Sequence, residues 1–211
     1  MDIKEAKKIM GKNFIGPEEL LLVSEKLGVL VPKRIPQIRY DKIFLQHVAK
    51  THLLIFTPNK TTTNQPLTLN SLRTFFGIDP EVGEPCFYNQ DWYVKEKFAH
   101  IALKSAWYLI RKDVLLESRA QQPDILEKNL KKEEEFPQAI FATFVFFAYY
   151  FLNNGRLLWK HDFIWCKDRD ANGDRIYVGR YIDPKKINKN GFNIHRHLTL
   201  RPCYAATVVV Q

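Results

Sequence analysis

The sequence predicts a single α+β domain in which one buried central helix packs against a C-terminal set of short strands. The helix is indicated by a run of 14 residues, Ala139 to Leu152, that is hydrophobic on every face. The strands are indicated by residues 156–211, where short alternating runs are separated by Asn-Gly, Asp-Pro and Arg-Pro steps. Because no repeat and no linker divides the 211 residues, we expect one domain over 1–211.

Two helices are predicted at the start of the chain. Asp2 can cap a helix from Ile3 to Met10, and Pro17 occupies a first-turn position ahead of a second helix. Gly28 then ends this second helix, since glycine tolerates the left-handed backbone of a helix C-terminus.

An extended segment, a strand and a short helix are predicted next. Two prolines between Val29 and Tyr40, Pro32 and Pro36, interrupt any helix, and the apolar residues 51–58 indicate a strand. Residues 67–77 fit an amphipathic helix, with Thr68 or Asn70 as its cap.

A further strand and a surface helix are predicted before the buried helix. Branched and aromatic residues favour a strand from Ala106 to Val114. Residues 118–135 are typical of a surface helix, whose charged run from Lys131 to Glu135 forms a solvated face.

Composition excludes disorder for the chain as a whole, because 45% of the residues are hydrophobic. The net charge of +9 permits nucleic acid, an anionic surface or an acidic ligand as a partner, and requires none of them. Residues 156–211 hold 11 Lys and Arg against five Asp and no Glu, which gives +6. We therefore expect any binding face to lie in this part of the chain.

Several classes of protein are not indicated by the sequence. Cys86, Cys166 and Cys203 have no zinc-site spacing and do not suggest a disulfide framework. The first ten residues lack the apolar core of a secretory signal, and no apolar run reaches the roughly 18 residues that span a bilayer. We expect a monomer without a membrane span, cytoplasmic by default.

The spacing of Asp168, Asp170, Asn172 and Gly173 matches the first positions of a calcium-binding loop. Position 12 of such a loop would be Gly179, so the closing bidentate carboxylate is missing. A hairpin turn explains the same residues, because Asn-Gly supplies the backbone that a tight turn requires. We favour the turn and predict no structural calcium.

No arrangement of residues indicates catalysis. His195 and His197 would share one face of a strand and could bind a metal, with Asp183 or His161 as the only candidates for a third ligand. An exposed polar strand also explains these histidines, and we favour this explanation over a metal site. No nuclease, nucleophile or phosphate-loop motif is present, so we expect no enzyme activity, no cofactor and no metal.

Aromatic residues alternate with cations in the C-terminal part and leave two interpretations open. Such a mixture can stack nucleobases while it neutralises phosphates, and it is equally typical of a protein-recognition surface. The residues concerned are Trp159, Phe163, Trp165, Tyr177, Tyr181, Phe192 and Tyr204.

The pattern of residues 166–179, CKDRDANGDRIYVG, followed by Arg180-Tyr181 and by GFNI at 191–194, resembles a known family. It is similar to the variable proteins that diversity-generating retroelements alter in archaea and small-genome bacteria, and the helix 137–152 followed by NNGRLLW also looks like theirs. The resemblance implies a C-type lectin-like fold in which residues 156–211 form a variable, ligand-binding region.

From this resemblance and from strand alternation we predict a non-enzymatic recognition protein with an unidentified macromolecular ligand, expected to be a protein. The alternative is a basic nucleic-acid-binding or nuclease domain. The predicted ligand-binding residues should gather on one solvent-exposed face or in a shallow pocket: Trp165, Lys167, Tyr177, Arg180, Tyr181, Asn193, His195, Arg196 and His197. The alternative is that Tyr177 and Tyr181 pack beneath a loop and that the histidines are ordinary surface residues.

Overall fold

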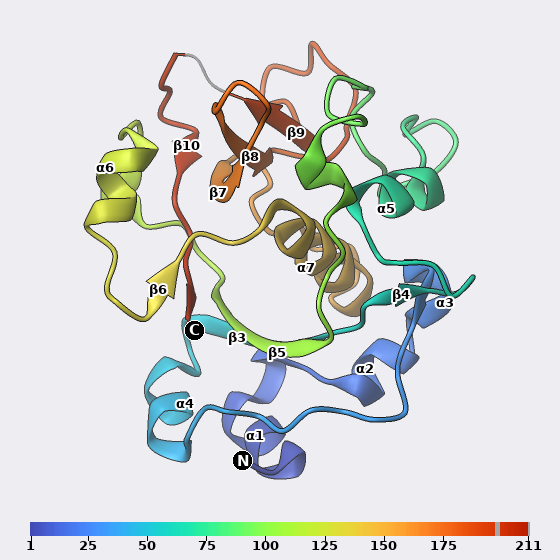
Figure 1. Cartoon of the computed structure of the whole chain (residues 1–211), viewed down its shortest axis with the longest axis vertical. Coiled ribbons are helices and arrows are strands. Elements are labelled where there is room, and N and C mark those ends of the chain that lie inside the picture. Colours follow the sequence, from blue (N-terminus) through green and yellow to red (C-terminus); the bar gives the residue numbers. More distant parts are fainter. Residues whose placement is uncertain (197–198, 211) are drawn as a thin grey trace.

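The computed structural model describes residues 1–196 and 199–210 and has a mixed α+β architecture with several sheets (Figure 1). His197, one of the predicted ligand-binding residues, lies outside the described residues. The main hydrophobic core runs from Ala6 to Val210, so residues from both ends of the chain share it.

The largest sheet has five strands, in the order β1-β3-β5-β11-β6. Its centre is the antiparallel pair of β3 and β5, which are in register from His52 opposite Arg111 to Thr57 opposite Ala106. The strand predicted at 51–58 is confirmed, and the one predicted at 106–114 ends earlier, at Arg111. The strands are β1 (Phe14–Ile15), β3 (His52–Thr57), β5 (Ala106–Arg111), β6 (Glu134–Glu135) and β11 (Val209–Val210).

The C-terminal strands form a second sheet, in the order β10-β7-β8-β9. Strands β7 (Phe163–Arg169) and β8 (Arg175–Gly179) are a hairpin, as the turn interpretation of residues 168–174 predicted. The neighbours are β9 (Asn193–Arg196), antiparallel to β8, and β10 (Tyr204–Ala205), parallel to β7. A third sheet pairs β2 (Val29–Leu30) with β4 (Lys60–Thr61).

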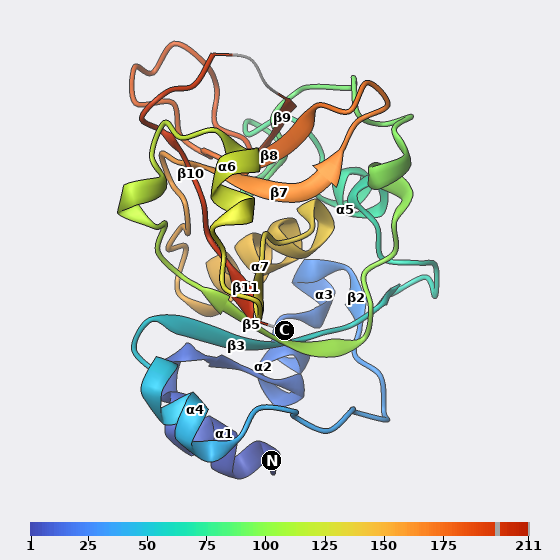
Figure 2. The ribbon, with the colours of Figure 1, turned by 60° about the vertical axis from the view of Figure 1, so that its left-hand side comes forward.

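Helix α7 (Ala139–Leu152) lies between the two larger sheets, as Figures 1 and 2 show. All residues from Ala139 to Ala148 are buried, which confirms the prediction of a buried central helix. A helix that is apolar on every face can only be stable when it is covered on all sides, and here strands of both sheets and two of the short helices contribute to that cover.

Helices α1, α2 and α4 lie on the opposite side of the large sheet from α7, whereas α3 and α5 contact α7 (Figure 2). The other helices are α1 (Ile3–Met10), α2 (Pro17–Leu21), α3 (Ser24–Leu27), α4 (Lys42–Val48), α5 (Leu69–Phe76) and α6 (Pro123–Lys128). Three short 3₁₀ helices complete the structure: Gly11–Asn13, Lys97–His100 and Leu116–Ser118.

Three expectations for the helices are corrected. The second predicted helix is interrupted at Leu22 and Val23, which leaves α2 and α3. Helix α4 was not predicted; it begins where Asp41 accepts a hydrogen bond from Phe44 N at 2.8 Å. The predicted surface helix 118–135 is reduced to α6, because Glu134 and Glu135 pair with β11 as an edge strand instead.

Candidate functional site

The two faces of the C-terminal sheet differ in the side chains that they carry. Strand alternation places aliphatic side chains on the inner face, against α7, and aromatic side chains on the outer face. The inner-face residues are Ile164, Cys166, Ile176, Val178 and Ile194. The outer aromatic cluster consists of Phe163, Trp165, Tyr177 and Tyr204, together with Phe136 and Ala206. This separation follows from the alternation of side chains along each strand.

Tyr177 is the centre of the outer aromatic cluster. Its ring meets those of Phe163 and Trp165 edge to face, with centroids 4.9 and 5.1 Å apart, and that of Tyr204 at 4.7 Å. On the remaining side it stacks on the imidazole of His195 at 5.4 Å, with only 3° between the planes. The rings thus cover one another and form a rigid base beneath the surface.

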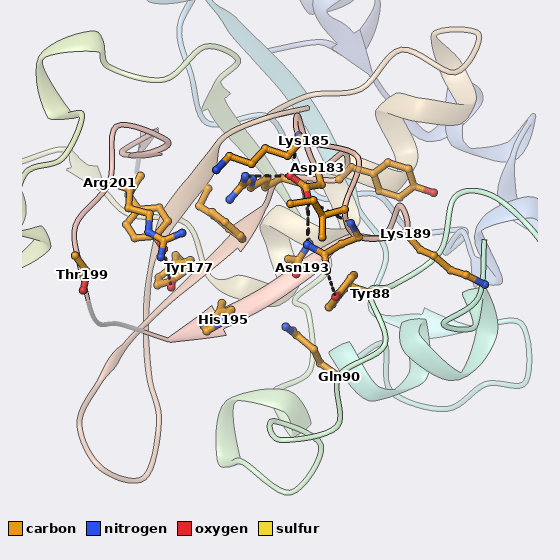
Figure 3. Close-up of a pocket in the computed structure, with 16 residues that line it drawn as sticks. Tyr88, Gln90, Tyr177, Asp183, Lys185, Lys189, Asn193, His195, Thr199 and Arg201 are labelled. Carbon is orange, nitrogen blue, oxygen red and sulfur yellow. Dashed lines mark hydrogen bonds and ion pairs between the residues drawn. The ribbon is translucent and has the colours of Figure 1, made fainter. Parts of the chain in front are cut away.

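A pocket of about 500 Å³ lies beside this cluster (Figure 3). Of the 16 described residues that line it, 14 come from 156–211 and the other two are Tyr88 and Gln90. The lining residues from the C-terminal part are Phe163, Tyr177, Arg180, Tyr181, Asp183, Lys185, Ile187, Asn188, Lys189, Asn193, His195, Thr199, Arg201 and Tyr204. We call this cavity the C-terminal pocket.

One wall of the C-terminal pocket is the loop of residues 183–190, which Asp183 organises. Its carboxylate accepts hydrogen bonds from Lys185 N at 3.1 Å and from Asn188 N and Nδ2 at 3.2 and 2.9 Å. Arg180 forms an ion pair with the same carboxylate at 3.4 Å. These donors, the backbone N–H of Lys185 first among them, hold the pKa of Asp183 below its usual value. The Asp183 carboxylate therefore stabilises this loop.

A second wall follows the end of β8, where the backbone takes an unusual conformation. Gly179 has φ of +119°, and a Cβ at this position would lie 2.6 Å from the carbonyl oxygen of Asp162, so only glycine fits. Arg180 follows with φ of +44°, and Asn193 Nδ2 donates to its carbonyl oxygen at 3.1 Å. The position of the Arg180 side chain is thus set by its backbone.

The C-terminal pocket is positively charged. Four cations line it, Arg180, Lys185, Lys189 and Arg201, against the single carboxylate of Asp183. Lys189 also lies 3.4 Å from Asp79, outside the pocket. Among the described residues, neither Lys185 nor Arg201 has an ion-pair partner, so their charges remain available to a ligand.

The structure brings five of the nine predicted ligand-binding residues together in this pocket: Tyr177, Arg180, Tyr181, Asn193 and His195. Two others lie elsewhere, because Lys167 binds Glu135 at 3.0 Å and Arg196 binds Asp170 at 2.6 Å. Arg196 also lies over the Trp92 ring at 4.6 Å, on the opposite face of β9 from His195. The prediction that Lys167 and Arg196 gather with His195 is therefore wrong, because acidic partners hold both cations away from the pocket and successive side chains of a strand point to opposite faces.

The prediction that the aromatic members are displayed on the surface is wrong. Trp165, Tyr177 and Tyr181 are only 3%, 1% and 2% exposed. Trp165 and Tyr177 are covered because α6 and the segment before β10 pack on the outer aromatic cluster through Leu126 and Leu200. Tyr181 turns inward, where its hydroxyl accepts a hydrogen bond from Cys86 N at 3.2 Å. Trp165 does not reach the C-terminal pocket, and the two tyrosines contribute only parts of its base.

Several lining residues were not among the predicted ones. Lys185, Ile187, Asn188 and Lys189 belong to the segment DPKKINKNG, whose density of Lys and Asn is typical of an exposed loop. Arg201 is contributed by the chain before β10, and the sequence carries no local signal that this segment returns to β8.

The candidate calcium carboxylates are engaged within the protein. Asp168 Oδ2 accepts from Ala139 N, at the start of α7, at 2.6 Å. Asp170 Oδ1 accepts from Asn172 N and Asp174 N at 2.9 and 2.8 Å, while its Oδ2 faces Arg196. Gly173 takes φ of +87° in the turn. Within residues 1–196 and 199–210, no three His, Cys, Asp or Glu side chains are placed to hold a metal ion.

The comparisons with known proteins identify no relative of this chain. No family model, no curated protein and no solved structure matches the chain. Among the described helices, none is both long and apolar enough to cross a membrane. The resemblance to retroelement variable proteins stays a prediction.

Proposed function

We propose that this chain is a non-enzymatic recognition protein that binds a ligand in the C-terminal pocket, on a C-type lectin-like scaffold. The observation that supports this most is the origin of the pocket, since 14 of its 16 lining residues belong to 156–211. Its volume of about 500 Å³ falls within the roughly 300–1,000 Å³ typical of ligand sites. The same segment is the one that the family resemblance marks as variable.

Buried and exposed residues of this segment have separate roles, which suits a surface whose sequence can vary. Inner-face residues such as Val178 and Ile194 belong to the core, whereas Lys185, Ile187, Thr199 and Arg201 are exposed at the pocket. Substitution at exposed positions generally changes stability by less than about 0.5 kcal/mol. The rim of the pocket could therefore change its specificity while the fold is kept.

The chemistry of the pocket also favours binding over catalysis. Burial raises the pKa of both Tyr177 and Tyr181 well above the usual value, so neither hydroxyl is readily deprotonated to act as a nucleophile or a base. Asp183 is held by the loop and by Arg180. A general base with a raised pKa, next to a nucleophile, would have favoured an enzyme instead.

The proposal is tested by selecting ligands from a displayed random-peptide library on the immobilised protein. Thr199→Trp places a large side chain at the exposed rim of the pocket, and Thr62→Trp, at an exposed position outside the lining, is the matched control. We expect selected ligands to bind the wild type and Thr62→Trp, and to lose at least about tenfold in affinity for Thr199→Trp.

Two results would count against the proposal. Ligands that bind Thr199→Trp as well as the wild type would place recognition outside the pocket. Generic DNA that binds with a steep salt dependence, while no selected peptide does, would support the alternative of a nucleic-acid-binding domain.

A further inference from the structure

We infer that the ligand of the C-terminal pocket is an acidic peptide segment of a protein partner, an inference that depends on the proposed function. The pocket combines uncommitted positive charge, unpaired polar atoms and an exposed apolar side chain. Each of these features corresponds to one part of such a peptide.

Lys185 and Arg201 carry the positive charges of the pocket that have no ion-pair partner among the described residues. In Figure 3 their side chains extend from two different loops into the pocket, and neither has an ion-pair partner among the described residues. A guanidinium can bind a carboxylate through two parallel hydrogen bonds, and an ammonium adds a second point charge. Two cations from separate loops therefore suit two acidic side chains, or one that lies between them.

The unpaired polar atoms lie at Gln90 and Arg180. Gln90 Oε1 and Arg180 Nε are both buried from solvent, and neither has a hydrogen-bond partner in the part of the chain that the structure describes. One atom is an acceptor and the other a donor. A small movement of either side chain on binding would let a peptide group supply the complementary function, and leaving such atoms unpaired generally costs about 1–3 kcal/mol each.

The apolar contribution comes from Ile187, which lines the pocket although it is 76% exposed. It belongs to the loop that Asp183 organises, so its backbone is held in place. An apolar ligand side chain packed here would remove the isoleucine from water and add to the electrostatic attraction.

Nucleic acid fits the same region less well. Nucleobase stacking requires accessible ring faces, and the rings of Phe163, Trp165 and Tyr177 are buried against one another. Six of the 11 cations of 156–211 are already paired with acids of this chain: Lys167, Arg169, Arg175, Arg180, Lys189 and Arg196. Fewer cations without an acidic partner are therefore left to contact the phosphates of a nucleic-acid backbone.

The test uses an array of capped nonapeptides, each with three Glu residues among Gly, Ser, Tyr and Leu, and a matched array with Gln at the Glu positions. The oligonucleotide (dT)12 is a third probe. The pocket variant combines Lys185→Gln with Arg201→Gln. The control combines Arg156→Gln with Lys160→Gln, which removes the same charge from cations of the same region that do not line the pocket.

We expect a subset of Glu peptides to bind the wild type and the control variant, with at least about tenfold weaker binding to the pocket variant and to the Gln array. Equal losses in both variants, or tighter binding of (dT)12, would overturn the inference in favour of general charge attraction. The inference would also be overturned if no Glu peptide bound the pocket variant more weakly than the wild type. Gln peptides that bind equally well and are blocked by Thr199→Trp would overturn the acidic class while they leave the proposed function intact.

Discussion

The inner and outer faces of the C-terminal sheet are both buried, yet they are built from different side chains and serve different purposes. The inner face packs aliphatic residues such as Ile164 and Val178 onto α7 and belongs to the core of the whole molecule. The outer face packs aromatic residues around Tyr177 and forms a separate, smaller cluster that borders the pocket. Facing away from the main core is thus not the same as facing solvent.

The difference has a physical basis in the shapes of the two coverings. Helix α7 is a continuous apolar surface that aliphatic side chains can fill closely. The outer face is covered only by α6 and by the irregular chain before β10, which leave gaps that large rings fill better and a pocket where the cover ends. The scaffold is therefore on one face and the candidate site on the other.

The largest expected effect lies on the inner side, at Phe146 of α7. Its buried ring lies 4.6 Å from Phe192 and 5.5 Å from Tyr181. We expect Phe146→Ala to lower the free energy of unfolding by roughly 3–5 kcal/mol, because it leaves a cavity where α7 packs against the C-terminal part of the chain. Guanidinium denaturation measures this, with the half-exposed Phe75→Ala as control. A loss below about 1 kcal/mol would mean that α7 is not the centre of the fold.

A smaller effect is expected where Asp170 and Arg196 join the hairpin to β9. Because Arg196 keeps 33% of its side chain in solvent, we expect Asp170→Asn to cost roughly 1–2 kcal/mol at neutral pH. Burial acts to raise the pKa of Asp170, but the hydrogen bonds from Arg196 and from the backbone of Asp174 and Asn172 outweigh it and leave the pKa lowered.

The lowered pKa predicts how this contribution depends on pH. A carboxyl whose pKa is lower in the folded state binds fewer protons there, so its stabilisation is present above the unfolded value of 3.8 and is lost as the pH falls below it. The difference in unfolding free energy between the wild type and Asp170→Asn should stay constant from pH 7 to pH 5 and shrink below pH 4. A difference that grows on acidification would contradict this assignment.

On the outer side, Tyr177→Phe should change stability by less than about 1 kcal/mol. A neutral hydroxyl hydrogen bond contributes only about 1 kcal/mol net, and the ring packing against Phe163, Trp165 and Tyr204 is retained in the variant. Thermal unfolding followed by circular dichroism gives the value. A loss as large as that of Phe146→Ala would show that the outer cluster, too, is essential for the fold.

The smallest expected effect is that of calcium on the hairpin turn. Since the carboxylates of Asp168 and Asp170 already accept hydrogen bonds from the protein, we expect millimolar calcium and a chelator to leave the Tm unchanged. A Tm that rises with calcium and falls with the chelator would establish a site in this turn.

Local signals in the sequence predicted the elements that depend on local chemistry. The continuous apolar run predicted α7, and Asn172-Gly173 predicted the hairpin turn. Each of these follows from residues that are neighbours in sequence, so no knowledge of distant partners was required.

The parts that were missed depend on contacts between distant residues. Helix α4 has only seven residues and follows a proline-containing segment, so its packing against α1 was invisible in the sequence. The pairing of Glu134–Glu135 with β11 and the return of Arg201 toward β8 join segments far apart in the chain. Burial of Trp165 and Tyr177 likewise depends on this return, which is why their exposure was predicted wrongly.

The most direct test of the account is a map of backbone amide chemical shifts during titration with a Glu-containing nonapeptide from the array. We expect saturable changes at Lys185, Asn193, His195 and Arg201, around the C-terminal pocket, and none along α7 or at Arg156 and Lys160. Changes spread evenly over the cations of the chain, or centred away from the pocket, would contradict the claim that the outer side of the C-terminal sheet forms the binding site.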